Sequence, residues 1–333
     1  MHTQAIVITA PEQVELREVA LTAAGPEDVI IQTAYTSISA GTERMLFAGR
    51  MPHPMLKLPV VPGYETVGRV VEVGPNAPLD LKGQWVYVGG ARCYADVNPA
   101  WGGQSATLIV DYRRVVLLND VPPEQGVLLA LGATALHGVD LLTAEGAEQA
   151  LNAASAAPAV KHSLAGKRVL VLGQGPVGQL AARIAQAQGA WVAVSELSAS
   201  RLARSQADVR LDGDAPLADT LGGPVDAIVE ATGSMAALAS AIPALGNNGT
   251  VLLLGYYEKL ELPYMPLFLK QARLLTAKEW GPNDLQRVRD MIADGTLEIE
   301  RLITHRMPAD QPAAAYRVAL EDAECLKLLL EWP

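Results

Sequence analysis

The chain is poor in cysteine, which narrows the kinds of site it can build. Its two cysteines, Cys93 and Cys325, are far apart in the sequence and belong to no C-x-x-C pair. We therefore expect neither a disulfide framework nor a four-cysteine structural zinc lobe. This cysteine usage is typical of a reducing compartment and predicts a cytoplasmic protein.

Basic charge and long apolar runs are also scarce. Lys and Arg together number 26 against 36 for Asp and Glu, which gives a formal net charge of -10. A nucleic-acid partner or a polybasic membrane anchor needs a basic face, so we expect neither. The longest apolar stretch, around 127–136, is interrupted by Gly132 and Thr134, and it is shorter than the roughly 18 residues of a membrane-spanning helix. The sequence thus predicts no integral membrane segment.

Apolar residues are abundant and follow two patterns. They make up half of the residues, which is enough for a buried core, and the length of 333 residues predicts about two domains. In the first 120 residues, short Val- and Ile-rich runs are separated by Gly- and Pro-containing turns, which predicts a β-barrel or sandwich. From Gly166 to about Gly255, apolar strands alternate with helices, the pattern of βαβ units on a parallel sheet.

The fold class that follows is α/β, with domain boundaries that we draw after residues 125 and 282. Residues 1–125 are predicted to form a β-rich domain, 126–282 a dinucleotide-binding domain, and 283–333 a return to the first domain. An alanine-rich stretch, 143–165, is expected to be a surface helix or an extended connection. We find no chemistry in that stretch.

A glycine-rich turn is the clearest motif. It lies between a predicted strand, 168–172, and a predicted helix that begins at Gln179. In such a G-x-G-x-x-G turn, one glycine permits the tight turn, one lets the backbone approach a pyrophosphate, and one lets the helix pack on the sheet. The N-terminus of the helix then presents free N–H groups to the phosphates. The predicted cofactor contacts are Gly173, Gly175, Pro176, Val177 and Gly178.

The second predicted strand of this domain ends at Ser195 and Glu196, which we add to the cofactor contacts. Glu196 lies 18 residues after Gly178. Its carboxylate can accept from both adenosine ribose hydroxyls and would repel a 2′-phosphate, so we expect NAD rather than NADP. Arg201 is a nearby cation that could serve a phosphate, which keeps the choice open.

Two later loops also follow predicted strands, at the edge where open parallel sheets bind ligands. We expect them to flank the nicotinamide half of the cofactor. The first loop is 230–233 and begins at Glu230, and the second is 254–256. The cofactor contacts that we expect in them are Ala231, Thr232, Gly233, Leu254, Gly255 and Tyr256.

A family resemblance follows from the segment 61–74, which reads VPGYETVGRVVEVG. It resembles the G-H-E-x-x-G-x-V-x-x-V-G signature of the medium-chain dehydrogenase/reductase superfamily. The segment 302–306 resembles the strand with which that family re-enters its catalytic domain. The resemblance spans essentially the whole chain. It implies a GroES-like β-barrel catalytic domain and a Rossmann domain, a doubly wound parallel sheet.

The resemblance also implies further contacts. Thr134 and Lys327 stand where relatives contact the nicotinamide and the pyrophosphate, and a lysine suits an anionic pyrophosphate. Residues 262–269 correspond to a strand through which relatives form homodimers. We therefore expect a homodimer.

The zinc ligands of zinc-dependent relatives are replaced in this chain. Their positions fall on Ala40, Tyr64 and Ala130. Alanine cannot ligate and a neutral tyrosine is a poor ligand, so we expect no metal.

Without zinc, oxidation of a secondary alcohol needs a hydrogen-bonding relay or a general base. Our candidates, in order, are Tyr64 as proton acceptor or orienter, Thr42 as relay and Glu43 as base. Glu65 is expected to have a structural role, bonding to backbone or to a cation.

One branch of the superfamily matches more closely. The segment 37–52, SISAGTERMLFAGRMP, resembles S-G-I-S-x-G-T-E-R-x-L-x-x-G-R-M-P of the branch that acts in bacteriochlorophyll synthesis. This implies NAD-dependent oxidation of the C3 1-hydroxyethyl group of a bacteriochlorophyllide, a tetrapyrrole, to acetyl. A flat apolar macrocycle needs a broad aromatic cleft. The candidate substrate contacts are Ser39, Arg44, Phe47, Tyr94, Trp101 and Tyr257.

Three other functions stay open at this point. One is a zinc-free quinone or enone reductase of the same fold that uses NADPH. The others are a zinc-type polyol dehydrogenase and a non-enzymatic binding protein that kept the fold.

Overall fold

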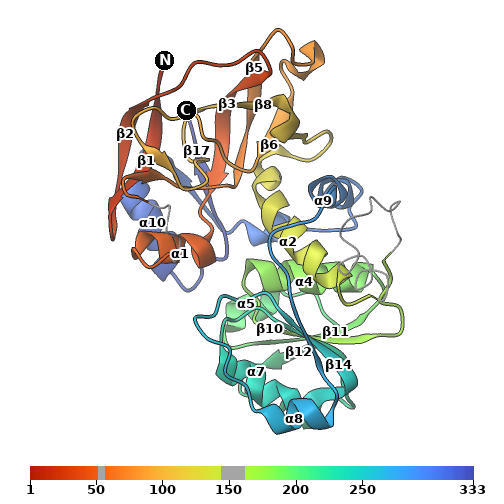
Figure 1. Cartoon of the computed structure of the whole chain (residues 1–333). Coiled ribbons are helices and arrows are strands. Elements are labelled where there is room, and N and C mark those ends of the chain that lie inside the picture. Colours follow the sequence, from red (N-terminus) through yellow and green to blue (C-terminus); the bar gives the residue numbers. More distant parts are fainter. Residues whose placement is uncertain (52–56, 144–161) are drawn as a thin grey trace. The chain divides into compact units, whose positions relative to one another are not determined.

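The computed structural model describes residues 1–51, 57–143 and 162–333 (Figure 1). Most of the alanine-rich stretch 143–165 therefore lies outside the described residues. The chain divides into two compact units. The first unit comprises Met1–Ala130 and Ile299–Pro333, and the second comprises Leu131–Glu298.

Two β-sheets form the first unit. One has the strand order β2-β1-β4-β7, and the other has the order β16-β17-β3-β5-β6-β9 with β8 also paired to β3. The strand bounds are β1 (His2–Ala10), β2 (Gln13–Ala20), β3 (Asp28–Ser37), β4 (Val60–Val61), β5 (Thr66–Val73), β6 (Trp85–Val88), β7 (Asn98–Pro99), β8 (Thr107–Asp111), β9 (Val115–Leu117), β16 (His305–Pro308) and β17 (Leu328–Glu331).

Alternating burial explains why these segments are strands. In β3, Val29, Ile31 and Thr33 are buried while Ile30 and Gln32 are not, because successive side chains of a strand point to opposite faces. The C-terminal segment completes the sheet, since Leu330 of β17 pairs with Thr36 of β3.

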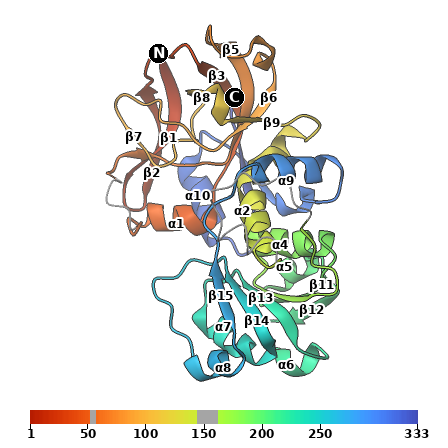
Figure 2. The same ribbon diagram turned by 45° about the vertical axis from the view of Figure 1, so that its right-hand side comes forward.

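Two helices, α1 (Ala40–Phe47) and α10 (Pro312–Glu321), lie side by side in the first unit, as Figure 2 shows. The unit also contains short 3-10 helices: η1 (Leu79–Leu81), η2 (Tyr112–Arg114), η3 (Pro123–Leu128) and η5 (Glu300–Leu302). The ring of Phe47 packs on that of Tyr316, with centroids 5.2 Å apart. This contact fixes α1 to α10.

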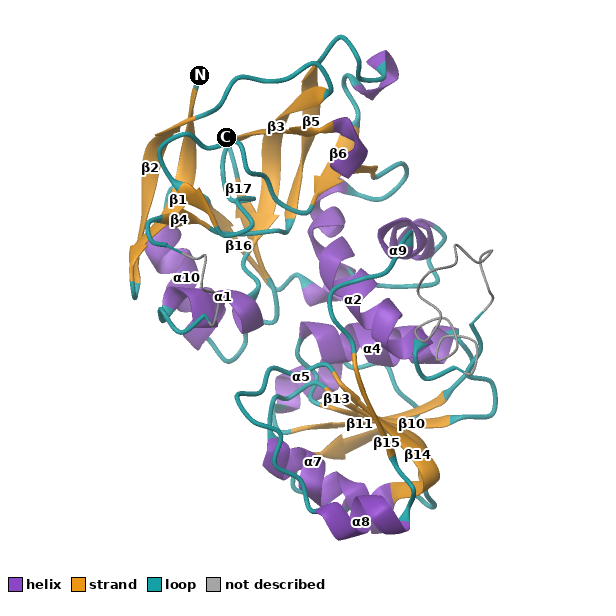
Figure 3. Cartoon of the chain, viewed as in Figure 1, coloured by secondary structure: helices purple, strands orange, loops and turns teal. Residues whose placement is uncertain are grey.

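A six-stranded parallel sheet forms the centre of the second unit (Figure 3). Its strand order is β12-β11-β10-β13-β14-β15. The bounds are β10 (Arg168–Leu172), β11 (Trp191–Glu196), β12 (Val209–Asp212), β13 (Val225–Glu230), β14 (Leu245–Leu253) and β15 (Arg273–Thr276). The apolar run of β10 is buried from Val169 to Leu172, as expected of a strand covered on both faces.

Helices cover both faces of this sheet. Figure 3 shows α4 (Pro176–Ala187) and α5 (Ala199–Arg204) on one face and α7 (Met235–Ala241) on the other. The other helices in the described part of this unit are α2 (Leu129–Asp140), α6 (Leu217–Thr220), η4 (Ile242–Ala244), α8 (Tyr264–Leu269) and α9 (Asp284–Ala293). The predicted α/β class, with a β-rich unit and a parallel dinucleotide-binding sheet, is confirmed.

The structure corrects one element. Residues 262–269 were predicted to be a strand, but α8 occupies most of this range and the edge strand of the sheet is β15. Pro263 and Pro266 explain the difference. Proline lacks the N–H that a sheet ladder needs, and its fixed φ suits the first turn of a helix.

The unit boundaries also differ from those drawn on the sequence. The chain leaves the second unit after Glu298, so α9 belongs to that unit and not to the C-terminal return. Arg287 of α9 donates to Asp140 of α2 at 2.6 Å. A Cβ on Gly132 of α2 would lie 2.6 Å from Val288, so the two helices are in close contact.

No helix in the described part of the chain is both long and apolar enough to cross a membrane.

Candidate active site

Three hydroxyl groups meet in the first unit, and we call Ser39, Thr42 and Tyr64 the hydroxyl cluster. The Tyr64 hydroxyl donates to Ser39 Oγ at 2.6 Å and lies 3.2 Å from Thr42 Oγ1. Trp101 packs edge-on against the Tyr64 ring, with centroids 5.4 Å apart. Four residues predicted as catalytic or substrate contacts are thus brought together from three separate segments.

Tyr64 remains a neutral phenol at neutral pH. Burial raises its pKa above the ordinary value, and the negative charge of Glu65 raises the pKa further. The bonds to Ser39 and Thr42 oppose this shift only in part. The geometry therefore fits an orienting hydrogen-bond donor better than it fits a tyrosinate base.

Glu43 of α1 is fully buried beside the hydroxyl cluster. Its carboxyl accepts from the Tyr316 hydroxyl at 2.5 Å, from Gln104 Nε2 at 3.1 Å and from the backbone N–H of Ser39 at 3.0 Å. Burial raises the pKa of Glu43 to about 7, although the Tyr316 and Ser39 bonds act in the opposite direction. A carboxyl that titrates near neutrality can take up and release a proton.

Sequence reasoning missed Tyr316 and Gln104. Both are polar groups in buried segments, and neither belongs to a motif. Their only signal was a polar side chain among apolar neighbours.

Lys327 lies in the C-terminal segment of the first unit, and its contact with the pyrophosphate stays a prediction. Its ammonium is buried in the first unit, where it pairs with Glu65 and donates to the Ile38 carbonyl at 3.1 Å. Ser37 also donates to Glu65. A buried ammonium requires such a partner, so Lys327 supports the segments on either side of the hydroxyl cluster. The structural role expected for Glu65 agrees with these bonds.

Three predicted substrate contacts do not join the cluster. Tyr94 lies in the core, and its hydroxyl donates to the Gly102 carbonyl at 2.7 Å. Phe47 packs on Tyr316. Arg44 is exposed on α1 and donates to the Leu320 carbonyl. Core packing surrounds the Tyr94 ring, and its role as a substrate contact stays a prediction.

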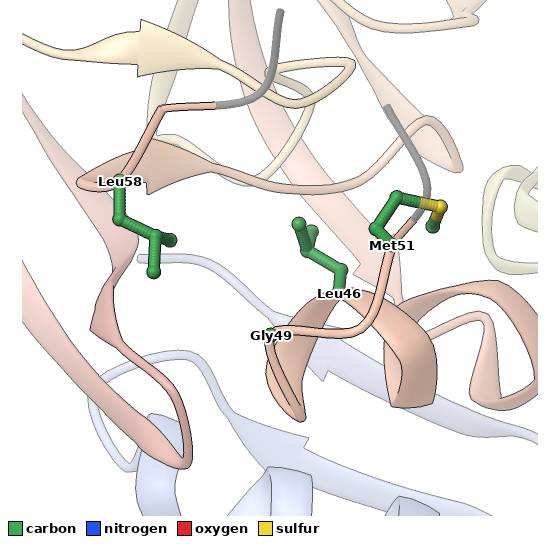
Figure 4. Close-up of a pocket in the computed structure, with 4 residues that line it drawn as sticks. All are labelled: Leu46, Gly49, Met51 and Leu58. Atoms are coloured by element: carbon green, nitrogen blue, oxygen red, sulfur yellow. The ribbon is translucent and has the colours of Figure 1, made fainter. Parts of the chain in front are cut away.

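A small apolar pocket opens beside α1 (Figure 4). Its lining residues are Leu46, Gly49, Met51 and Leu58. The cavity measures about 80 Å³, whereas sites for drug-sized ligands span roughly 300–1,000 Å³. This pocket cannot hold a macrocycle.

The glycine turn, residues 173–178, lies at the carboxyl end of β10 in the second unit. Gly173 has a φ of +84°, and Gly175 begins α4 without a side-chain cap. A Cβ on Gly175 would meet no atom within 4 Å, whereas a Cβ on Gly178 would lie 2.0 Å from the Gly173 carbonyl oxygen. An uncapped helix start that faces open space fits a pyrophosphate. Pro176 and Val177 form the first turn of that helix.

Glu196 supports the glycine turn directly. Its carboxylate accepts from the N–H groups of Gln174 at 2.6 Å and Ser198 at 2.9 Å. The Ser195 carbonyl accepts from Gly173 N at 2.8 Å. Arg201 lies on α5, and its Nε is buried without a hydrogen-bond partner among the described residues.

The two later loops lie at the same edge of the sheet, after β13 and β14. Leu254 and Gly255 both donate through their backbone N–H groups to the Glu230 carbonyl. Tyr256 is half exposed, while the hydroxyl of Tyr257 donates to the Glu230 carboxylate. Tyr257 therefore lies at the edge of the sheet that holds the predicted cofactor loops. Glu230 was not predicted as a site residue.

Thr134 lies half-buried on α2, one turn before Gly138. A Cβ on Gly138 would lie 2.8 Å from the Leu254 side chain, so this part of α2 packs on the end of β14. The structure thus brings Thr134 toward the edge that holds the predicted cofactor loops.

The donor set at the positions of the zinc ligands does not fit zinc. Ala40 and Ala130 supply no donor atom, and Tyr64 is a neutral phenol. Within residues 1–51, 57–143 and 162–333, no three His, Cys, Asp or Glu side chains are grouped closely enough to hold a metal ion.

Two family models match the chain. The alcohol dehydrogenase GroES-like domain matches residues 25–120, and the zinc-binding dehydrogenase matches residues 176–294. The 2-desacetyl-2-hydroxyethyl bacteriochlorophyllide A dehydrogenases of Rhodobacter capsulatus and Cereibacter sphaeroides are 34% and 32% identical to the chain. Each comparison covers 100% of this chain and 99% of the relative.

Solved structures agree with the fold. A zinc-binding dehydrogenase from Sinorhizobium meliloti bound to NADP superposes with a TM-score of 0.81 at 24% identity, over 99% of both chains. A short chain alcohol dehydrogenase from Escherichia coli complexed with NADH gives 0.80 at 19% identity, again over 99% of both chains. The chain therefore belongs to the medium-chain dehydrogenase/reductase superfamily and is an oxidoreductase.

Proposed function

We propose that this protein oxidises the C3 1-hydroxyethyl group of a bacteriochlorophyllide to an acetyl group, with NAD as hydride acceptor, in bacteriochlorophyll synthesis. The observation that carries this proposal is the full-length similarity to two bacteriochlorophyllide A dehydrogenases, at 34% and 32% identity. The substrate is a secondary alcohol. Its carbon loses a hydride, its oxygen loses a proton, and the products are a ketone, NADH and a proton.

The nicotinamide cofactor, when bound, supplies the hydride acceptor. The first unit supplies groups for the proton. In the hydroxyl cluster, the Tyr64 hydroxyl lies 2.6 Å from Ser39 Oγ and 3.2 Å from Thr42 Oγ1. These three hydroxyls can hold the substrate oxygen and pass its proton. Glu43 accepts from the Ser39 backbone N–H, a bond that holds its carboxyl beside the cluster but does not relay a proton. Its pKa of about 7 suits a residue that takes up a proton near neutral pH.

We propose that this chemistry is zinc-independent and uses NAD rather than NADP. Ala40 and Ala130 support zinc independence because neither can ligate a metal. Glu196 supports NAD, since a carboxylate beside the adenosine ribose repels a 2′-phosphate. Arg201 favours the alternative, an NADPH-dependent quinone or enone reductase of the same fold, because its buried Nε has no partner among the described residues.

We further propose a homodimer, assembled in the cytoplasm through one apolar surface of the second unit. This surface consists of α8 and the edge strand β15. Tyr264 and Leu269 are 69% and 70% exposed, and Tyr264 stacks on Phe268. Exposed apolar residues beside an unpaired edge strand are typical of an interaction site. Sedimentation equilibrium of wild type and Phe268→Asp tests this assembly.

An absorbance assay tests the activity. The purified protein is mixed with NAD and 3-hydroxyethyl bacteriochlorophyllide a. Conversion to a conjugated acetyl group shifts the red absorption band while NADH forms in equal amount. A protein that binds NAD yet produces no shift would contradict the proposed substrate. Turnover of a quinone or enone with NADPH would favour the alternative.

A further inference from the structure

Glu230 is a fully buried carboxylate at the carboxyl end of β13. It accepts from Thr232 N at 2.7 Å and from Gly233 N at 3.1 Å. It also accepts from the hydroxyls of Thr232 and Tyr257. No ion pair with Glu230 is formed by the described residues, so four neutral donors compensate its burial.

These donors belong to the two loops that follow β13 and β14, and both loops pack closely on the carboxylate. A Cβ on Gly255 would lie 2.6 Å from Glu230 Oε2 and 2.7 Å from the Tyr257 hydroxyl oxygen. Only glycine fits there. Glu230 therefore fixes the conformation of both loops at once.

The contacts of Glu230 extend to the glycine turn. A Cβ on Gly173 would lie 2.7 Å from the methyl carbon of Thr232, so the threonine that Glu230 holds packs against the first glycine of the turn. On the other side of β10, Glu196 accepts from Gln174 N. Two carboxylates, from the strands on either side of β10, thus support the same turn.

We propose that Glu230 is a positioning residue for the nicotinamide cofactor, and that it acts through Tyr257 and Thr232. Through its bonds to Tyr257 and Thr232, Glu230 holds residues 231–233 and 255–257 in the arrangement that receives the dinucleotide. This inference rests on the proposed use of a nicotinamide cofactor, and it is independent of which alcohol is oxidised. Tyr257 then affects cofactor affinity and not substrate contact.

The chemistry explains why a carboxylate is needed. Glutamine has one acceptor oxygen, and its NH₂ group would face the backbone N–H of Thr232 or of Gly233, for which the described residues offer no other acceptor. Tyr257→Phe is milder, because it removes one of the four donors and leaves the backbone bonds in place. The two variants form a graded series.

The test measures NADH binding to the full-length protein without substrate, by the fluorescence of bound NADH. Tyr257→Phe should raise the dissociation constant about five- to tenfold, and Glu230→Gln should raise it further, since hydrogen bonds to charged groups are strong. The matched control is Tyr112→Phe. Tyr112 is a half-buried tyrosine of the first unit that lies outside both sites, so this variant should bind NADH as wild type does. Thermal unfolding is followed in parallel.

The outcomes separate the two proposals. A Tyr257→Phe protein that binds NADH as wild type does, with only a lower Tm, would overturn the positioning role, because a structural role alone lowers stability and leaves the affinity of the folded protein unchanged. If Glu230→Gln does not fold, Tyr257→Phe alone decides. Wild type that binds NADH but does not oxidise the bacteriochlorophyllide would refute the proposed substrate and leave this test valid.

Discussion

The two candidate sites use carboxyl groups in different ways. In the second unit, Glu196 and Glu230 accept from backbone N–H groups and hold loops in place. In the first unit, Glu43 accepts one backbone bond and two side-chain bonds, and its burial raises its pKa to about 7. The comparison teaches that one region is built to keep a fixed shape for a charged cofactor. In the other region, burial raises the pKa of Glu43 into the range where a carboxyl gains or loses a proton near neutral pH.

We expect the largest effect from Gly178→Ala, in the glycine turn of the second unit. The added Cβ would lie 2.0 Å from the Gly173 carbonyl oxygen, so the turn must move. We expect NAD affinity to fall by about a hundredfold or more, as the helix N-terminus no longer faces the pyrophosphate. Isothermal titration calorimetry measures this loss.

Gly175→Ala is the matched variant. Its Cβ would meet no atom of the protein within 4 Å, so thermal stability should be retained while NAD affinity falls. Wild-type affinity in Gly175→Ala would contradict the placement of the pyrophosphate at this turn.

The raised pKa of Glu43 in the first unit predicts that the free energy of unfolding falls as the pH rises. The pKa of Glu43 is raised from 4.5 to about 7, so between these values the folded state binds more protons than the unfolded state. The contribution of Glu43 to the free energy of unfolding is fully present below pH 4.5 and is lost as the pH rises through 7. The loss amounts to at most roughly 3 kcal/mol.

Urea unfolding of wild type and Glu43→Gln at pH 5 and pH 8 checks this expectation. The charged and titratable groups around Glu43 are Tyr316, Glu65 and Lys327. The variant keeps them, so the difference between the two proteins isolates Glu43. An identical pH dependence in both proteins would rule out the raised pKa.

Tyr64→Phe removes the central hydroxyl of the cluster. We expect kcat to fall about a hundredfold, the scale of lost acid–base assistance, while the dissociation constant for NAD stays unchanged. Stopped-flow turnover and NADH fluorescence measure the two quantities, and Tyr112→Phe again serves as the control. Unchanged turnover would remove Tyr64 from the mechanism.

Glu196→Gln should have the smallest effect. The neutral side chain no longer repels a 2′-phosphate, so the preference for NAD over NADP should shrink by about tenfold. Its NH₂ group also faces one of the two backbone N–H groups that the carboxylate accepts from, so affinity should fall for both cofactors alike, and the ratio isolates the effect of charge. The ratio of kcat/KM for the two cofactors reports the change. A ratio that does not move would assign the preference to Arg201 or another group.

The two regions also differ in how far the sequence predicts them. The cofactor edge is encoded locally, because a glycine turn and the residues that end parallel strands meet at one edge by the geometry of the fold. Gly173, Glu196 and Thr232 could therefore be named in advance. Glu230 was missed because its task, the compensation of loop donors, is visible only when both loops are in place.

The first unit is assembled from distant segments, and the sequence predicted it less well. Tyr64 and Thr42 were found through the family signature. Tyr316, on α10, contacts Glu43 only because the C-terminal segment returns to the first unit. Lys327 was assigned to the pyrophosphate from the family resemblance and its charge. Its pairing with the buried Glu65 could not be predicted, because the partner lies far away in the sequence.

One measurement tests the central claim most directly. Wild type treated with a strong chelator, and shown by elemental analysis to hold no zinc, is given NAD and 3-hydroxyethyl bacteriochlorophyllide a. The account predicts that the red band shifts and that NADH forms at the untreated rate. Loss of turnover on chelation, restored by added zinc, would contradict a mechanism that relies on the hydroxyl cluster and Glu43.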